Sequence, residues 1–532
     1  MATIGGEIER AEGGRGRIVP AASLVGAALT LLGVAWLFAR NAARSPYPWV
    51  NHDVAFLSWC GEEILRGARL YLEFLEMNPP GAHYLHAGLA AAAHAVGLPV
   101  VLTDHLFVLA LGALGCIVAW RALAGEPDDL TAAVVVPAYL LVVVRGNFSN
   151  NIIPSAPGYP YDFGQREHLF ALLFVPYVLW RLSRRPLGGA MIAYLGALGF
   201  VAVFKPQWLV LVAAVEAYAA LRDRRTSRGA WIGLVMGSLV PWILLAAGSW
   251  DSVTSFFGDV MPMMLVEGYG RYGMGSAFFA SRLHAQMVVA LLLFTPCWVL
   301  AFRLGAVSRK DAALPPLVVA GCYASGLVQG KYWSYHVMVY FGAVTVLGAW
   351  LLARAIRAGT TGRARLVTAA AVVVASWLAV GASVAGMADM LASYPPKGHE
   401  LVPLIRGRDP VMFVSTSADY AYAPLLTGTE TVGPWREHVR LSIILADDDA
   451  ARRDRAVDAY AAEIAARIED RRPELVLFSP ARAGLPEGVH IHDVLAAHGA
   501  IPRGYERIPE EVLVALDIRL IGWVVYRREP RS

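Results

Sequence analysis

The chain has little cysteine and no strong excess of either charge. It holds 4 cysteines in 532 residues, and Cys116, Cys297 and Cys322 lie inside apolar runs. A disulfide framework and a CxxC metal site are therefore excluded. The formal net charge is +4, and the arginines form short clusters between apolar runs. Because no single basic face results, nucleic acid is not an expected partner.

Hydrophobic residues dominate instead. They make up 57% of the chain, the mean hydropathy is +0.49, and apolar runs recur near the ~20 residues that cross a bilayer. The sequence therefore predicts a polytopic α-helical membrane protein with about eleven transmembrane helices. The expected spans are residues 21–39, 99–123, 131–145, 168–182, 188–204, 207–221, 230–248, 284–303, 313–329, 335–355 and 366–387.

The topology depends on residues 82–96, which could cross the membrane or lie along its surface. If they crossed, the arginine-rich loops after residues 182 and 221 would lie outside, against the positive-inside rule. We therefore interpret them as a juxtamembrane helix, with His83, His86 and His94 toward water. Every arginine cluster is then cytoplasmic, and the C-terminal part is external.

This topology predicts two domains. Residues 1–390 form the transmembrane domain, with external loops at 40–98, 146–167 and 249–283. After Tyr394-Pro395-Pro396 the composition changes, and strand-like runs alternate with a charged helix. Residues 397–532 are therefore predicted to form a small soluble α/β domain on the periplasmic side.

A polar segment follows the first span and begins with Asn51-His52-Asp53. Apolar residues then recur at helical spacing through residues 54–64, which indicates an interfacial amphipathic helix. One interpretation is that Asp53 only caps this helix. Leu70-Tyr71 and the run Asn78-Pro79-Pro80-Gly81 come next.

The order of these features resembles the first external loop of membrane glycosyltransferases of the GT-C class. Within that class the chain is most similar to the bacterial GT39 branch, which includes the lipid A aminoarabinose transferases and the rhizobial galacturonosyltransferases. The resemblance implies that Asp53 is a catalytic carboxylate and that His52, Tyr71 and Asn78 contribute to substrate binding. The aminoarabinose transferases carry a lysine directly before the Pro-Pro pair, where this chain has Asn78, so the lipid phosphate must be bound by other residues.

The role of the carboxylate stays open. It can take the proton of an acceptor hydroxyl as a general base, or it can hold a divalent metal ion against the leaving phosphate. No cofactor follows with certainty, and a divalent metal is the one candidate. Histidines at 52, 83, 86 and 94 match no zinc motif in their spacing.

The second external loop ends in Asp162, Arg166 and Glu167, immediately before a span. The resemblance places a second acidic residue here, so Asp162 and Glu167 are candidate catalytic residues and Arg166 is a candidate phosphate ligand. Charge this close to a bilayer is costly, which favours function. The alternative is a solvated loop in which Glu167 complements a helix dipole.

Lysine is rare, and two of the four lysines, Lys205 and Lys331, fall at external ends of expected spans. Lys331 and His336 lie in a Gly-Lys-aromatic-Tyr-His segment that resembles bacterial members of the class. Both lysines and His336 are candidates for binding the lipid phosphate. The alternative is that the lysines extend toward the interface beside an aromatic belt.

The last candidates are Arg271 and Arg282, in the glycine-containing external loop at 249–283. Their guanidinium groups can pair with a phosphate in bidentate fashion if this loop closes over a donor. A surface loop without a function explains them almost equally well.

The resemblance implies an inverting glycosyltransferase of the bacterial inner membrane that uses a polyprenyl-phosphate sugar at the periplasmic face. The acceptor would be a glycolipid, a polysaccharide or a protein, with membrane lipids around the chain. One alternative is a transporter or flippase of lipid-linked glycans. Such a protein is expected to carry ionisable residues near the midpoints of its spans. In this chain Glu216 is the main residue of that kind. Another is a polysaccharide polymerase or ligase with a pyrophosphate leaving group.

Overall fold

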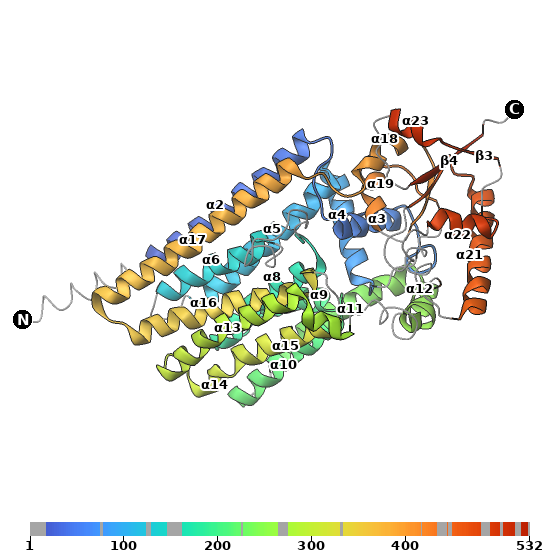
Figure 1. The fold of residues 1–532 in the computed structure, drawn as a ribbon. Coiled ribbons are helices and arrows are strands. Elements are labelled where there is room, and N and C mark those ends of the chain that lie inside the picture. Colours follow the sequence, from blue (N-terminus) through green and yellow to red (C-terminus); the bar gives the residue numbers. More distant parts are fainter. Residues whose placement is uncertain are drawn as a thin grey trace, which may run out of the picture. The chain divides into compact units, whose positions relative to one another are not determined.

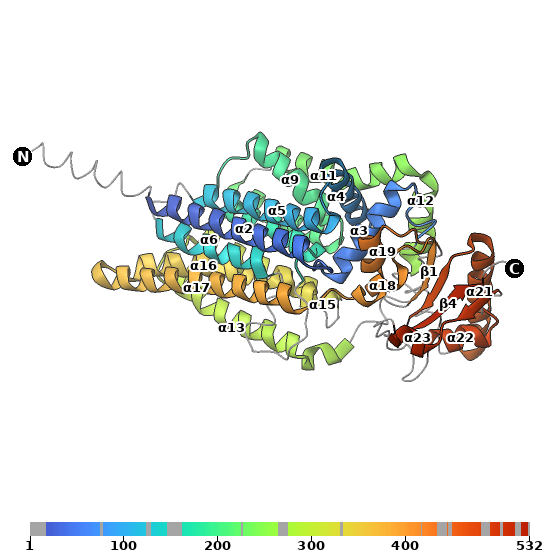
Figure 2. The ribbon, with the colours of Figure 1, turned by 90° about the horizontal axis from the view of Figure 1, so that it is seen from above.

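The computed structural model describes most of the chain as helices, with one small sheet near the C-terminus (Figures 1 and 2). The described residues are 18–74, 78–123, 129–145, 162–224, 227–263, 275–329, 334–415, 418–432, 444, 449–479, 490–500, 504–515 and 523–529. They divide into two compact units. Unit 1 comprises residues 1–44, 102–241 and 273–394, and unit 2 comprises residues 45–101, 242–272 and 395–532.

Unit 1 contains the following helices among the described residues: α2 (Ile18–Arg44), α5 (Val100–Leu123), α6 (Asp129–Arg145), α8 (Arg166–Leu182), α9 (Gly189–Ala202), α10 (Gln207–Asp223), α11 (Arg228–Gly248), η4 (Gly275–Ala280), α13 (Arg282–Arg303), α14 (Arg309–Ala312), α15 (Leu314–Gln329), η5 (Ser334–Val337), α16 (Met338–Gly359) and α17 (Gly362–Ser393). Helices α5 and α11 continue into unit 2. Each of the eleven expected spans coincides with one of the helices of unit 1. In the described part of the chain, seven are long and apolar enough to cross a membrane. The chain is a multi-pass membrane protein, as predicted.

Helix α16 lies at the centre of unit 1. It packs against α6, α8, α13, α15 and α17. In its most apolar 18-residue stretch, 78% of the residues are buried. In the corresponding stretch of helix α17 only 11% of the residues are buried. Most of the apolar surface of α17 is therefore available to lipid.

Glycines let α9 and α11 approach closely. A Cβ atom added at Gly237 would lie 1.9 Å from the carbonyl oxygen of Gly196, and one added at Gly199 would lie 2.3 Å from that of Leu234. Small residues at a helix crossing allow such backbone contact in membranes. Substitution of Gly237 must therefore separate the two helices.

Unit 2 begins with α3 (His52–Leu65) and α4 (Gly81–Val96), which pack on each other. The other elements of this unit among the described residues are α12 (Trp250–Ser255), η1 (Phe256–Val260), η6 (His399–Leu401), α18 (Val402–Ile405), β1 (Val411–Val414), η7 (Ala418–Ala421), α19 (Tyr422–Thr427), α21 (Ala450–Arg471), β2 (Leu475–Phe478), α22 (Ile491–Ala497), β3 (Tyr505–Arg507), α23 (Glu510–Ala515) and β4 (Val524–Arg528). Residues 45–101 therefore belong to the same compact unit as the C-terminal sheet.

The sheet has the strand order β1-β2-β4-β3. Strands β1 and β2 pair in parallel, with Val411 opposite Leu475, and the other two pairings are antiparallel. Alternating residues of β1 point to opposite faces. Met412 packs with residues of α21 on one face, and Phe413 packs with residues of α3 and α19 on the other. The sheet is thus covered by helices on both sides, and one of these helices is α3.

The orientation expected for the histidines of α4 is wrong in two of three cases. His83 and His86 are 0% and 4% exposed, and His94 is exposed. The cause is the packing of α4 against α3, which buries the face that carries both side chains. Helix α4 has 16 residues and is not among the seven helices suited to crossing a membrane.

Candidate active site

The N-terminus of α3 is capped by Asn51 and not by Asp53. The Asn51 side chain accepts hydrogen bonds from the backbone N–H groups of Asp53 (2.9 Å) and Val54 (3.4 Å). The interpretation of Asp53 as the cap is therefore wrong. Asp53 lies in the first turn, where the positive end of the helix dipole stabilises a carboxylate.

His52 accompanies Asp53 at this position. Its Nε2 atom lies 3.4 Å from Oδ1 of Asp53, and both side chains are 22% exposed. The carboxylate is thus open to solvent next to a group that can carry a positive charge.

The turn after α3 holds Tyr71 in an unusual conformation. Its φ is +70°, which is uncommon for a residue with a side chain. The Tyr71 N–H donates to the carbonyl of Phe74 at 2.8 Å, and its buried hydroxyl donates to the carbonyl of Asn78 at 2.6 Å. Tyr71 and Asn78 are therefore joined by a hydrogen bond in the structure.

Two polar contacts fix α3 on α4. The Ser58 hydroxyl donates to the carbonyl of Val54 at 2.8 Å, so it accepts from Nδ1 of His86 at 3.1 Å. His94 Nε2 lies 2.7 Å from Glu62. These contacts give His86 and His94 structural partners. Among the described residues no group of three His, Cys, Asp or Glu side chains is placed to hold a metal ion.

The other side of α3 packs on C-terminal residues of the same unit. The ring of Trp59 lies 6.2 Å from that of Tyr420, and the Tyr422 hydroxyl donates to the carbonyl of Pro48 at 3.0 Å. Glu63 is 7% exposed and accepts hydrogen bonds from Arg66 at 2.7 Å and from Thr431 at 3.3 Å. Burial raises the pKa of Glu63, and the neighbouring Arg66 opposes that rise.

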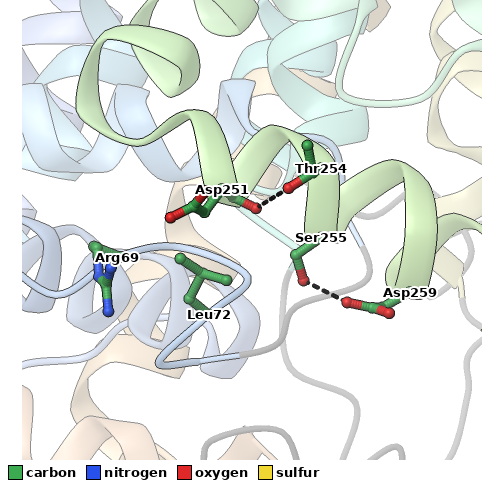
Figure 3. A pocket seen from close by; sticks show the side chains of 6 residues that line it. All are labelled: Arg69, Leu72, Asp251, Thr254, Ser255 and Asp259. Carbon is green, nitrogen blue, oxygen red and sulfur yellow. Dashed lines mark hydrogen bonds between the residues drawn. The ribbon is translucent and has the colours of Figure 1, made fainter.

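A polar pocket adjoins the Tyr71 turn (Figure 3). Its volume is about 560 Å³, and it is lined by Arg69, Leu72, Asp251, Thr254, Ser255 and Asp259. The Ser255 hydroxyl lies 3.0 Å from the carbonyl of Tyr71 and 2.8 Å from Asp259. Arg69 is paired with Glu73 at 2.9 Å, so the charge that remains on the lining is negative. This lining suits a ligand that bears hydroxyl or amino groups better than it suits a phosphate.

In unit 1 the structure gathers three of the predicted residues into a buried polar cluster. The Lys205 ammonium donates to Glu167 and to Gln329, and His336 Nε2 lies 3.8 Å from Glu167. Glu167 is 0% exposed, Lys205 8% and His336 4%. Lys205 is therefore a buried partner of a carboxylate and does not extend to the interface, and Glu167 does not lie in a solvated loop.

Asp162 and Arg166 lie beside this cluster in the sequence, and both are buried. The Ser334 hydroxyl donates to Asp162 at 2.7 Å. His168 accepts from the Gly164 N–H at 3.1 Å on one ring nitrogen and contacts the carbonyl of Val142 at 2.9 Å with the other. This histidine therefore holds the turn that carries Asp162 against α6.

Three predicted residues remain. Lys331 and Arg271 lie outside the described residues. Arg282 is an exposed residue at the first position of α13, after the N-cap Ser281.

Sequence reasoning missed Gln329, the second acceptor for Lys205, and Asp104, which is 2% exposed on α5. An ionisable residue within an apolar run was the available signal for Asp104. A glutamine at the end of a span carries no such signal.

No protein-family model matches the sequence, and no curated protein matches it. Among solved structures the chain is similar to ArnT from Cupriavidus metallidurans bound to undecaprenyl phosphate. The TM-score is 0.56 at 13% identity, and the match covers 95% of this chain and 99% of that one. The apo state of the same protein gives a TM-score of 0.54 at 14% identity, over 96% and 99% of the two chains. ArnT is a glycosyltransferase of the GT-C class. This chain therefore has the fold of the GT-C membrane glycosyltransferases, as the sequence resemblance predicted.

Proposed function

We propose that this chain is an inverting glycosyltransferase that moves a sugar from a polyprenyl-phosphate donor to an acceptor hydroxyl. The observation that carries the proposal is the position of Asp53. Its carboxylate is partly exposed at the N-terminus of α3, and Asn51 caps that helix in its place. The shared fold with a protein that was solved with undecaprenyl phosphate supports the class of donor.

In the proposed reaction the acceptor oxygen attacks the anomeric carbon from the face opposite the phosphate. Asp53 takes the proton of the acceptor hydroxyl as the new carbon–oxygen bond forms. The bond between the anomeric carbon and the phosphate oxygen breaks, and polyprenyl phosphate leaves with the electron pair. Attack from the opposite face inverts the configuration of the sugar. His52, 3.4 Å from Asp53, orients the carboxylate.

We assign the buried cluster of unit 1 to the phosphate. Lys205 is its cation, and Glu167 is the carboxylate that pairs with it. A donor phosphate next to Lys205 would then share this ammonium with Glu167. We further propose that the chain acts at the periplasmic face of a bacterial inner membrane, on a glycolipid, polysaccharide or protein acceptor.

The test is donor turnover by the purified full-length chain in lipid nanodiscs. A panel of polyprenyl-phosphate sugars is offered with and without candidate acceptors, and wild type is compared with Asp53→Asn. Removal of a general base lowers turnover by about 10²–10⁴-fold, so we expect a loss of that size. Stability should fall only by the helix-dipole contribution of about 0.3–1 kcal/mol. Asp454→Asn is the matched control, because Asp454 is a 65% exposed aspartate in the same unit.

Two outcomes would contradict the proposal. Full turnover by Asp53→Asn removes Asp53 from the chemistry. If wild type binds lipid-linked sugars but consumes none of them, with or without acceptors, a transporter of lipid-linked glycans becomes the better explanation.

A further inference from the structure

A second pocket lies in unit 1, at the ends of α10 and α14 that carry basic residues. Its volume is about 300 Å³, and it is lined by Tyr218, Leu221, Arg222, Arg224 and Lys310. The Tyr218 hydroxyl donates to the carbonyl of Lys310 at 2.5 Å, which ties α14 to α10. The positive-inside rule assigns these ends to the cytoplasmic leaflet.

The lining carries a positive charge that its neighbours do not neutralise. Arg222 is buried and paired with Asp223 at 2.8 Å and with Asp311 at 3.1 Å. Arg224 and Lys310 are exposed, and neither forms an ion pair with another described residue. The pocket therefore presents two cations to whatever enters it.

An apolar stripe leads along α10 to this pocket. Val210, Ala214, Ala217 and Leu221 are exposed, with Val210 at 68% and Leu221 at 80%. Their spacing of four, three and four residues places them on one side of the helix. The sequence predicts that α10 spans the membrane at residues 207–221. On a spanning helix such a stripe would face acyl chains, and here it ends at the basic pocket.

We propose that this pocket binds the headgroup of an anionic phospholipid whose acyl chains lie along the exposed stripe of α10. Basic pockets at the cytoplasmic ends of transmembrane helices recognise such headgroups. The stripe distinguishes a lipid from a free phosphate, which would use only the basic end. Arginines and lysines that only set the membrane topology need not line a pocket. Here they line one, and its wall includes the ion-paired Arg222.

The experiment measures lipid binding to the full-length chain in neutral detergent by native mass spectrometry. The probes are phosphatidylglycerol, phosphatidylcholine and inorganic phosphate. Wild type is compared with the double variant Arg224→Gln/Lys310→Gln. The matched control is Arg228→Gln/Arg309→Gln, which removes the same charge from exposed neighbours that do not line the pocket.

We expect wild type to bind phosphatidylglycerol in preference to phosphatidylcholine, and the pocket variant to lose roughly tenfold or more of that affinity. The control variant should keep it. An equal loss in both variants would assign the binding to diffuse surface charge. Inorganic phosphate that binds as tightly as the lipid, or phosphatidylcholine that binds equally well, would overturn the proposal as well. Donor turnover through Asp53 is a separate measurement, so either proposal can fail without the other.

Discussion

Removal of Lys205 should destabilise unit 1 far more than removal of both Lys205 and Glu167. The two side chains are 10% and 0% exposed, and they form an ion pair. In Lys205→Met the Glu167 carboxylate stays buried without its cation, since His336 lies 3.8 Å away. Breaking a buried pair in this way costs about 3–5 kcal/mol, whereas replacing both partners with neutral residues of similar size is often nearly neutral.

The expected result is therefore a large coupling energy. Lys205→Met should lose about 3–5 kcal/mol of unfolding free energy, and Lys205→Met/Glu167→Gln should recover most of it. Thermal unfolding in lipid nanodiscs, followed by tryptophan fluorescence, measures both variants together with Glu167→Gln. A double variant as unstable as Lys205→Met would refute the reasoning, because the pair would then not be the source of the loss.

The same variants test the assignment of Lys205 to the phosphate. If Lys205 only balances Glu167, the double variant should bind a polyprenyl-phosphate sugar as tightly as wild type. We expect the double variant to be stable and yet to bind the donor at least about tenfold more weakly, which is the loss of one charge-assisted hydrogen bond. Recovery of donor binding along with stability would remove Lys205 from the binding site.

Three further changes test local features of the fold by thermal unfolding. Tyr71→Phe removes the hydroxyl that donates to the Asn78 carbonyl, so it should cost about 1 kcal/mol, and an unchanged melting temperature would contradict this role. Gly237→Ala should lower the free energy of unfolding by about 1–3 kcal/mol, because it forces α9 and α11 apart. Gly381→Ala is the control and should cost nothing, because its new methyl group meets nothing within 4 Å. Equal effects of the two substitutions would show that the close helix crossing is not the cause. Because burial raises the pKa of Glu63, its contribution to stability is complete below the unfolded pKa and is lost as pH rises through the folded pKa. Wild type should therefore lose stability relative to Glu63→Gln from about pH 4 upward, and a difference that does not change with pH would contradict this.

The sequence predicted the helices of unit 1 well because a membrane span is a local pattern. Twenty apolar residues must form a helix in lipid, whatever lies around them. Two of the strand-like runs expected after Pro396, the apolar residues 411–414 and 475–478, likewise coincide with β1 and β2. The contacts of single side chains were not predictable in this way. His83 and His86 were expected to face water, and both are buried. His86 contacts Ser58, 28 residues away, and Lys205 is held by Glu167 and Gln329, which lie 38 and 124 residues away.

The segment that carries Asp53 shows why local motifs were not sufficient. Read alone, residues 51–81 are an external loop whose helix lies on the membrane surface. In the structure the apolar face of that helix, with Phe56 and Trp59, forms one core with residues 401–426 and with strands β1 and β2. Pairing between residues this distant cannot be deduced from periodicity, because periodicity shows that a face is apolar and not what covers it. The position of Asp53 therefore depends on the C-terminal part of the chain, because that part supplies the residues on which α3 packs.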